Sequence, residues 1–365
     1  MKLQCEEQHA IVQSPSPVDV HTEWDPLQEV IVGIIDDIRV PEWDLGLEAV
    51  IPEKAKDFFW THRGQRFPIE LLDLARKEVD GLASLLATEG IRVRRPEIVD
   101  HHRPIATPYF SCGGGFYSAM PRDSMLAIGN TLIEAPMAWR SRYFETFAFR
   151  DILNDYFQRG ARWISAPKPM LKDSLWVARS EEKKQKFESI IGNDEPLFDA
   201  ADFIKLGRDI IAQRSHVTNE KGIEWLRRHL GTDYKIHTYA FDDASPMHID
   251  TTILPLAPGK VLVNPAWVSE LPEILCEWEV LIPPPSQLKD NHPLLMTSKW
   301  IHTNVLMLDA KTVVVEKDEC DLISAFKKWG FDVIPCPFKH FQTFGGSFHC
   351  ATLDIRRQGS LKSYV

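Results

Sequence analysis

The segment Gly345–Arg357, close to the end of the chain, has the sequence GGSFHCATLDIRR. Its two glycines allow the backbone to turn sharply, because glycine adopts conformations that other residues avoid. A short run that alternates apolar and polar residues follows, as expected of a β-strand. Cys350 lies where this run begins, so its thiol can face a pocket. For this stretch taken alone, a buried and chemically inert cysteine is the alternative.

The rest of the chain repeats one unit, in which a helix ends and a strand follows. In four of the five units a glycine stops the helix, at positions 90, 160, 231 and 330. The predicted helices cover residues 68–89, 140–159, 220–230, 269–278 and 321–329, and the strands behind them cover residues 91–95, 161–165, 234–237, 280–282 and 331–334. Hairpins are predicted in front of the last four helices, with turns at residues 129–130, 258–259 and 309–310.

The order strand, strand, helix, strand therefore occurs five times, at intervals of roughly 50–70 residues, which is typical of repeat architectures. The N-terminal part holds only the later strands of a unit, beginning with residues 29–33, and Gly345–Arg357 supplies a lone first strand. The two ends thus complete one module and close a ring, which removes exposed sheet edges. An open α/β sheet with coincidental spacing is the alternative. We predict a single domain over residues 21–365, after a loose arm, rich in Ser, Pro and Gln, over residues 1–20.

Composition limits the partners that the protein can bind. The net charge of −10 argues against nucleic acid or an anionic membrane and favours a small cationic substrate. The first residues resemble neither a secretory signal nor a transit peptide, and no apolar run is long enough to span a bilayer. The six cysteines form no C-x-x-C pair, so we expect a reducing, cytoplasmic location.

Unusual polar residues gather in the segments that open the modules. These segments are residues 119–123, 198–202, 246–250 and 296–300, together with the stretch that holds Cys350. In a ring of modules they converge, and this brings together three Asp, one His and one Cys. Such a group suits nucleophilic catalysis on a cationic substrate.

Individual roles follow from residue chemistry. His248 and Asp250 are two positions apart on a predicted strand and so share a face. A histidine can donate and accept a proton near neutral pH, and Asp199 could fix its orientation. Asp123 and Asp250 could bind a guanidinium through paired hydrogen bonds. Taken singly, Asp123 could be a turn residue, Asp199 a cap and His248 a satisfied strand histidine.

A metal site and a phosphate-binding loop are the two other kinds of site that the sequence suggests. His248, Asp250 and His349 could ligate zinc or iron, but no H-E-x-x-H motif or clustered Cys/His spacing supports a metal. The run Gly113–Gly115 leads into a strand and not a helix, which argues against a phosphate-binding loop. We therefore expect neither a metal nor a cofactor.

Several long motifs in the sequence resemble those of a known family. They are SAMPRD (118–123), IEAPMAWR (133–140), FDAADF (198–203), GRDI (207–210), PMHID (246–250) and FHC (348–350). From Glu23 to the end, the chain resembles the arginine:glycine amidinotransferase family of the pentein superfamily, including the amidinotransferases of cyanobacterial toxin biosynthesis. The resemblance implies a five-bladed α/β propeller of ββαβ modules.

The resemblance also implies a role for each matching residue. Cys350 would attack the guanidinium carbon of L-arginine, and His248, partnered by Asp199, would protonate departing L-ornithine and then deprotonate the incoming amine. The substrate-binding positions implied are Asp123, Asp250, Ser298 and Met247. The covalent amidino-cysteine would pass to glycine or to a larger biosynthetic amine in a ping-pong reaction. No cofactor is implied, and the family suggests a homodimer.

One position departs from the vertebrate glycine-using pattern. Where those enzymes carry an arginine after an Asn-Pro pair, this chain has Asn264, Pro265, Ala266 and Trp267. The acceptor therefore stays open. Two other functions also stay open: a deiminase-type hydrolase that produces citrulline, and a non-catalytic binding protein of the same fold, which is disfavoured because no expected catalytic position is substituted.

Overall fold

The computed structural model describes residues 16–177 and 187–365, and within them five three-stranded sheets repeat one design. In each sheet, the middle strand pairs with one neighbour in the antiparallel sense and with the other in the parallel sense. The first sheet contains β17 (Thr352–Arg357), β1 (Leu27–Val32) and β2 (Arg92–Arg94). The second and third contain β5 (Met125–Ile128), β6 (Thr131–Glu134) and β7 (Arg162–Ser165), then β8 (Phe203–Leu206), β9 (Asp209–Gln213) and β10 (Lys235–Tyr239). The last two contain β11 (Ile253–Ala257), β12 (Lys260–Val263) and β13 (Glu279–Leu281), then β14 (Leu306–Met307), β15 (Thr312–Glu316) and β16 (Asp332–Cys336).

The five-bladed propeller of ββαβ modules is confirmed. A small separate pair, β3 (Ile105–Ala106) and β4 (Ser111–Cys112), lies outside this plan.

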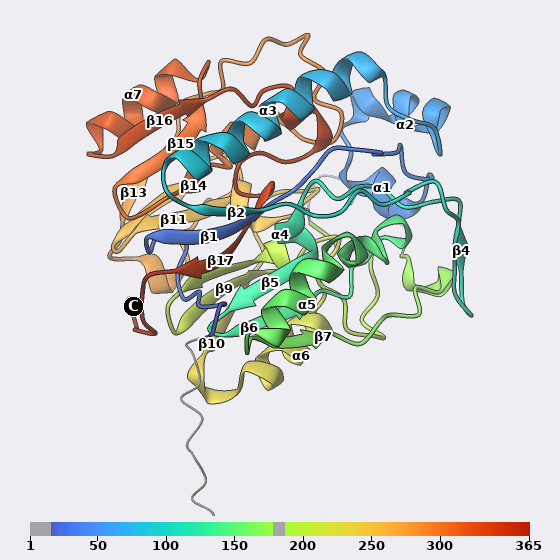
Figure 1. Cartoon of the computed structure of the whole chain (residues 1–365), viewed down its shortest axis with the longest axis horizontal. Coiled ribbons are helices and arrows are strands. Elements are labelled where there is room, and N and C mark those ends of the chain that lie inside the picture. The colour runs from blue at the N-terminus through green and yellow to red at the C-terminus, as the bar shows by residue number, and fades with distance from the viewer. Residues whose placement is uncertain (1–15, 178–186) are drawn as a thin grey trace, which may run out of the picture.

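The first sheet joins the two ends of the chain. β17 runs antiparallel to β1, with Asp354 opposite Val30 and Thr352 opposite Val32. Figure 1 shows this arrangement, the red β17 lying beside the blue β1. The C-terminal strand therefore completes the N-terminal module and closes the ring, as the sequence predicted.

Most of the predicted helices are confirmed. α3 (Ile69–Thr88), α5 (Arg150–Gln158), α6 (Glu220–Leu230) and α7 (Cys320–Lys328) each connect a middle strand to the parallel strand behind it. The predicted stop residues, Gly90, Gly160, Gly231 and Gly330, have positive φ angles of 83°, 97°, 65° and 90°. Glycine enters this left-handed region without steric cost, which explains why the helices end there. The shorter helices α1 (Leu45–Val50), α2 (Lys56–His62) and α4 (Pro121–Ser124) complete the set.

The helix predicted over residues 269–278 is wrong. Only a 3-10 turn, Glu273–Leu275, forms there. Pro272 precedes it with an extended ψ of 133°, and the turns that follow close through i to i+3 hydrogen bonds. Pro272 has no backbone N–H, so a helix cannot continue through it, and the residues between it and β13, which begins at Glu279, close as 3-10 turns.

The helix predicted over residues 140–159 is only half right. Its second half is α5, whereas the first half forms two 3-10 segments, Arg140–Arg142 and Glu145–Phe149. Arg142 and Glu145, at the end of the first segment and the start of the second, form a buried ion pair of 2.6 Å.

Residues 16–20 are predicted to belong to a loose arm, but they pack against the blades. Residues 1–15 lie outside the described residues, but Val18 and Val20 are completely buried. The backbone N–H of Asp19 donates to Ile355 O, and that of Val20 donates to Gly129 O. Residues 16–20 therefore pack across two neighbouring blades. None of the helices in residues 16–177 and 187–365 has the length and apolar character needed to cross a bilayer.

Two glycines provide a matched test of helix packing. A Cβ on Gly222 in α6 would lie 2.1 Å from Leu197 O, whereas a Cβ on Gly81 in α3 would meet nothing within 4 Å. We expect Gly222→Ala to lower the free energy of unfolding by about 1–3 kcal/mol through overpacking. Gly81→Ala should raise it by about 1 kcal/mol, because alanine favours helix. Urea unfolding of both variants measures this, and equal effects would contradict the close approach of α6 to Leu197.

Candidate active site

A single helical turn opens each of four blades and faces its neighbours. These turns are α4 before β5, a 3-10 turn Ala200–Asp202 before β8, a 3-10 turn Ile249–Thr251 before β11 and a 3-10 turn Lys299–Thr303 before β14. The turn α4 contacts the turn Ala200–Asp202, which in turn contacts Ile249–Thr251. The turn Lys299–Thr303 also contacts Ile249–Thr251. The turn before β17 carries Cys350. The predicted convergence of the segments that open the modules is therefore present.

Cys350 lines a cavity of about 660 Å³ and is 3% exposed. Gly345 and Gly346 allow this position. Gly345 has a φ of 96°, and a Cβ on Gly346 would lie 2.4 Å from Met120 Sδ and 2.8 Å from Cys350 Cβ. The two glycines thus deliver the sulfur to the cavity, as the sequence indicated.

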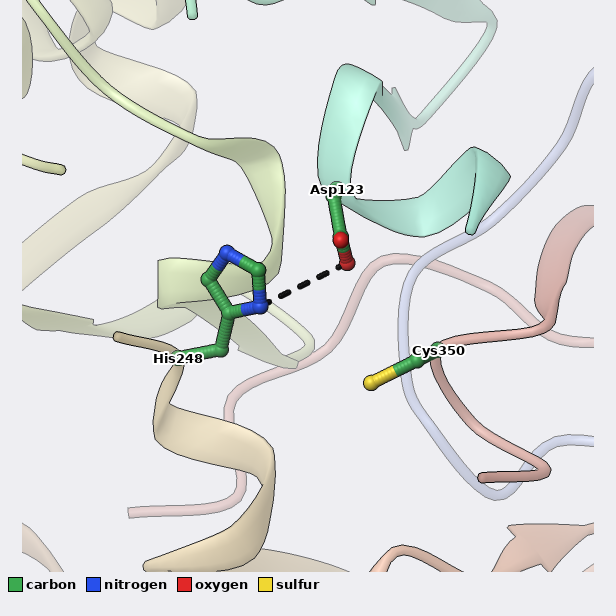
Figure 2. A group of neighbouring side chains, drawn as sticks. All are labelled: Asp123, His248 and Cys350. Atoms are coloured by element: carbon green, nitrogen blue, oxygen red, sulfur yellow. Dashed lines mark ion pairs between the residues drawn. The ribbon is translucent and has the colours of Figure 1, made fainter. Parts of the chain in front are cut away.

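Two carboxylates hold the imidazole of His248. Its Nε2 lies 3.1 Å from Asp199 Oδ2, and its Nδ1 lies 3.5 Å from Asp123 Oδ1. Figure 2 shows His248, Asp123 and Cys350 directed toward one shared space. Burial disfavours the charged ring, but Asp123 and Asp199 outweigh it and raise the pKa of His248 to about 10. At neutral pH the ring is therefore an imidazolium in the free protein.

The same surroundings favour the neutral form of the Cys350 thiol, whereas they favour the charged form of His248. Burial, followed by the negative charges of Asp250 and Asp123, raises the pKa of the Cys350 thiol well above its ordinary value. Asp250 Oδ2 lies 3.2 Å from Sγ and accepts from the thiol. The free protein thus pairs a neutral thiol with a charged imidazolium. A cation placed between the two carboxylates would favour the thiolate.

Asp123 and Asp250 each have one oxygen that accepts a hydrogen bond from the described residues and one that does not, although Asp123 Oδ1 forms an ion pair with His248 at 3.5 Å. Arg142 Nη1 donates to Asp123 Oδ2 at 3.0 Å, and His349 Nδ1 lies 2.8 Å from Asp250 Oδ2. The Oδ1 atoms of both aspartates are buried and accept no hydrogen bond from the described residues. Buried carboxylate oxygens strongly favour a hydrogen-bond donor, so this pair is prepared for a cation rich in N–H groups.

The predicted site residues fall into two groups. Met247, His248, Asp250, Ser298 and Cys350 line the cavity, and so does Trp267. The cavity lining does not include Asp123 or Asp199, and both contact it through His248.

One local prediction is wrong. His248 and Asp250 do not share a strand: His248 is the extended residue before the 3-10 turn Ile249–Thr251, and Asp250 lies inside that turn. β11 begins only at Ile253. Both side chains still line the cavity.

One group of side chains in the described part of the chain could hold a metal ion. Within residues 16–177 and 187–365, one group of His, Cys, Asp and Glu side chains has ligand atoms close enough, namely Asp123, His248 and Cys350, with all three atoms within 4.8 Å of one another. The sequence also allowed His349 as a metal ligand. Both of its ring nitrogens contact carboxylates, Nδ1 that of Asp250 and Nε2 that of Glu23.

Sequence reasoning missed two buried residues of the site. Arg142 is completely buried and lies 3.0 Å from Asp123 and 3.6 Å from Asp199. Asn304 Nδ2 lies 3.3 Å from Cys350 Sγ. Arg142 comes two positions after the IEAPMAWR motif, which is a weak pointer, and no spacing in the sequence identifies Asn304.

Comparison with known proteins agrees with this geometry. No family model matches the chain. L-arginine:L-lysine amidinotransferase of Pseudomonas savastanoi pv. phaseolicola is 51% identical over 352 residues, which cover 96% of this chain and 97% of that protein. The chain belongs to the amidinotransferase family. The mitochondrial glycine amidinotransferase of Xenopus tropicalis is 46% identical over 358 residues, covering 95% of this amidinotransferase and 85% of that protein.

A solved structure extends the likeness to three dimensions. SxtG, an amidinotransferase from Microseira wollei in the saxitoxin biosynthetic pathway, superimposes with a TM-score of 0.89 at 44% identity. The match covers 96% of this chain and all of that one. The resemblance stated from the motifs is thereby confirmed.

The charge on Asp199 should control the protonation of His248. Asp199→Asn keeps the size of the side chain but removes the charge beside Nε2, so we expect the pKa of His248 to fall from about 10 by about one unit or more. Titration of the histidine ring by NMR measures the change. Asp209→Asn is the matched control, because Asp209 lies 2.8 Å from His237 in β10. An unchanged His248 pKa in Asp199→Asn would contradict this account.

Proposed function

We propose that this amidinotransferase transfers the amidino group of L-arginine to a primary amine through Cys350 and releases L-ornithine. One observation carries the proposal. The sulfur, a histidine nitrogen and a carboxylate oxygen lie within 4.8 Å of one another, beside buried carboxylate oxygens that accept no hydrogen bond from the described residues. A guanidinium offers five N–H donors in a plane and a positive charge, which match this arrangement.

Binding of arginine starts the first half-reaction. Its guanidinium pairs with Asp123 and Asp250, and the added positive charge offsets the two carboxylates that oppose ionisation of the thiol. The thiol proton leaves to solvent, and the thiolate attacks the central guanidinium carbon. An S–C bond forms and the C–N bond to ornithine breaks. The His248 imidazolium gives its proton to the departing nitrogen.

The second half-reaction reverses these steps with a different amine. Neutral His248 accepts a proton from the incoming amine as its nitrogen attacks the amidino carbon. A new C–N bond forms, the S–C bond breaks, and the thiolate leaves. Asp199 holds the ring in one orientation throughout, so the same nitrogen serves as acid and then as base.

The acceptor is a primary amine, and the outer cavity selects it. The names of the relatives give L-lysine in one case and glycine in another. Met247, Ser298 and Trp267 line the cavity beyond the reacting atoms. We assign Ser298 to the backbone end of arginine, and Trp267 and Met247 to the wall against which the acceptor packs.

Two further predictions come from the sequence and the family. We propose a homodimer and a cytoplasmic location. Light scattering tests the first, and a mass of one chain would contradict it.

Ornithine and citrulline release from L-arginine tests the reaction. The assay is run without an acceptor, with glycine and with L-lysine. We expect at most one equivalent of ornithine per protein without acceptor, together with a mass increase of one amidino group on Cys350. We expect continuous release with a suitable amine. Citrulline under any condition would identify water as the acceptor and favour the hydrolase.

Cysteine variants separate the nucleophile from a general effect. Cys350→Ser should form no adduct and lose turnover by at least about a thousandfold, because the serine hydroxyl is far less ionised than a thiol. Cys276→Ser, at an exposed cysteine, is the control and should retain the activity of the parent protein. Full turnover by Cys350→Ser would show that Cys350 is a buried, chemically inert cysteine and not the nucleophile.

A further inference from the structure

Asn304 makes three contacts with the turn that presents the nucleophile. The residue ends the 3-10 turn Lys299–Thr303 and is completely buried. Its Oδ1 accepts from the backbone N–H of Ser347 at 3.2 Å and from that of Cys350 at 3.1 Å. Its Nδ2 donates to Cys350 Sγ at 3.3 Å.

The two backbone donors determine which way the amide points. A backbone N–H can only donate, so the atom that faces Ser347 and Cys350 must be the carbonyl oxygen. The NH₂ group must then face the sulfur. The reversed amide would set N–H groups against N–H groups and lose both bonds.

The sulfur therefore lies between groups of opposite character. On one side Asp250 Oδ2, at 3.2 Å, accepts from the thiol and stabilises its neutral form. On the other side Asn304 donates. When the thiol ionises, the contact with Asp250 becomes repulsive, whereas the N–H from Asn304 becomes a charge-assisted hydrogen bond.

We propose that Asn304 is a catalytic hydrogen-bond donor that stabilises the Cys350 thiolate, both when it attacks and when it leaves. This inference rests on the proposed role of Cys350 as the nucleophile. It adds a residue that opposes Asp250 at the sulfur. While the amidino group is attached, the sulfur carries no full negative charge and the contact weakens. The contact strengthens again as the thiolate is released.

The replacement Asn304→Asp separates this role from simple positioning. Aspartate has the same shape and keeps an oxygen acceptor for both backbone N–H groups, but it places a second oxygen at the sulfur. The measurement is the rate at which iodoacetamide, a neutral probe, alkylates Cys350 between pH 7 and 9, followed by mass spectrometry of the peptide that contains Cys350. We expect the rate to fall by about tenfold or more at each pH, because a like charge at this distance raises a pKa by about one unit or more.

Asn219 provides a matched control. It is also buried, its Oδ1 accepts from the backbone N–H of Leu197 and of Gly222, and its Nδ2 donates to two backbone carbonyls and not to a sulfur. Asn219→Asp should destabilise the fold to a similar extent and leave the alkylation rate of Cys350 within about twofold of the parent. If Asn304→Asp is also alkylated at the parent rate, Asn304 only positions the turn and the proposal is overturned.

A second variant covers the case in which Asn304→Asp does not fold, as judged by circular dichroism. Asn304→Ser replaces the amide with a shorter hydroxyl, which withdraws the N–H donor from the sulfur without adding charge, and we expect a smaller fall in the alkylation rate, about three- to tenfold. A parent-like rate in that variant would equally overturn the proposal. Because alkylation needs no transfer reaction, failure of the proposed function would show separately, as a parent protein that forms no amidino adduct.

Discussion

Arg122 joins parts of the chain that are far apart in sequence, and the closed ring depends on its contacts. Its guanidinium donates to Asp354 in β17 at 2.8 Å, to Glu23 at 3.4 Å and to the backbone oxygen of His349 at 2.7 Å. Glu23 also forms an ion pair with Lys205 of β8, at 2.7 Å. All these side chains are buried, and a buried charge is tolerated only with a partner. Removal of one member of such a pair typically costs about 3–5 kcal/mol, so the network favours one arrangement of the blades.

The same network extends directly into the active site. His349 contacts Glu23 on one side and Asp250 on the other, at 3.2 and 2.8 Å. Burial would favour the neutral acid at Asp250, but the hydrogen bond and charge of His349 hold the pKa of Asp250 below its usual value. Asp250 therefore remains a carboxylate beside the Cys350 sulfur. The interactions that close the fold also keep Asp250, the carboxylate proposed to bind substrate, negatively charged.

This arrangement favours the neutral thiol of Cys350 in the free protein. Carboxylates that are well placed to bind a guanidinium also oppose ionisation of a neighbouring thiol. In the proposed reaction, the cationic substrate would offset that opposition as it binds, so the thiol would ionise only in the occupied site. Asn304 and the His248 imidazolium act in the other direction, as a donor and a positive charge that favour the thiolate.

The amino-acid sequence by itself determined the module order, the glycine stops after four helices, the closure by the terminal strands and the list of catalytic candidates. These features depend on local preferences, such as the left-handed conformation of Gly90 or Gly330, or on long motifs around Asp123, His248 and Cys350. Only the tertiary structure decided the 3-10 turns at residues 140–149 and 273–275, the packing of residues 16–20, and the roles of Arg142 and Asn304. Each of these depends on contacts between residues that are distant in sequence or on a competition between hydrogen bonds and helix continuity. Asn304 is 46 positions from the sulfur to which it donates, and no local pattern encodes such a contact.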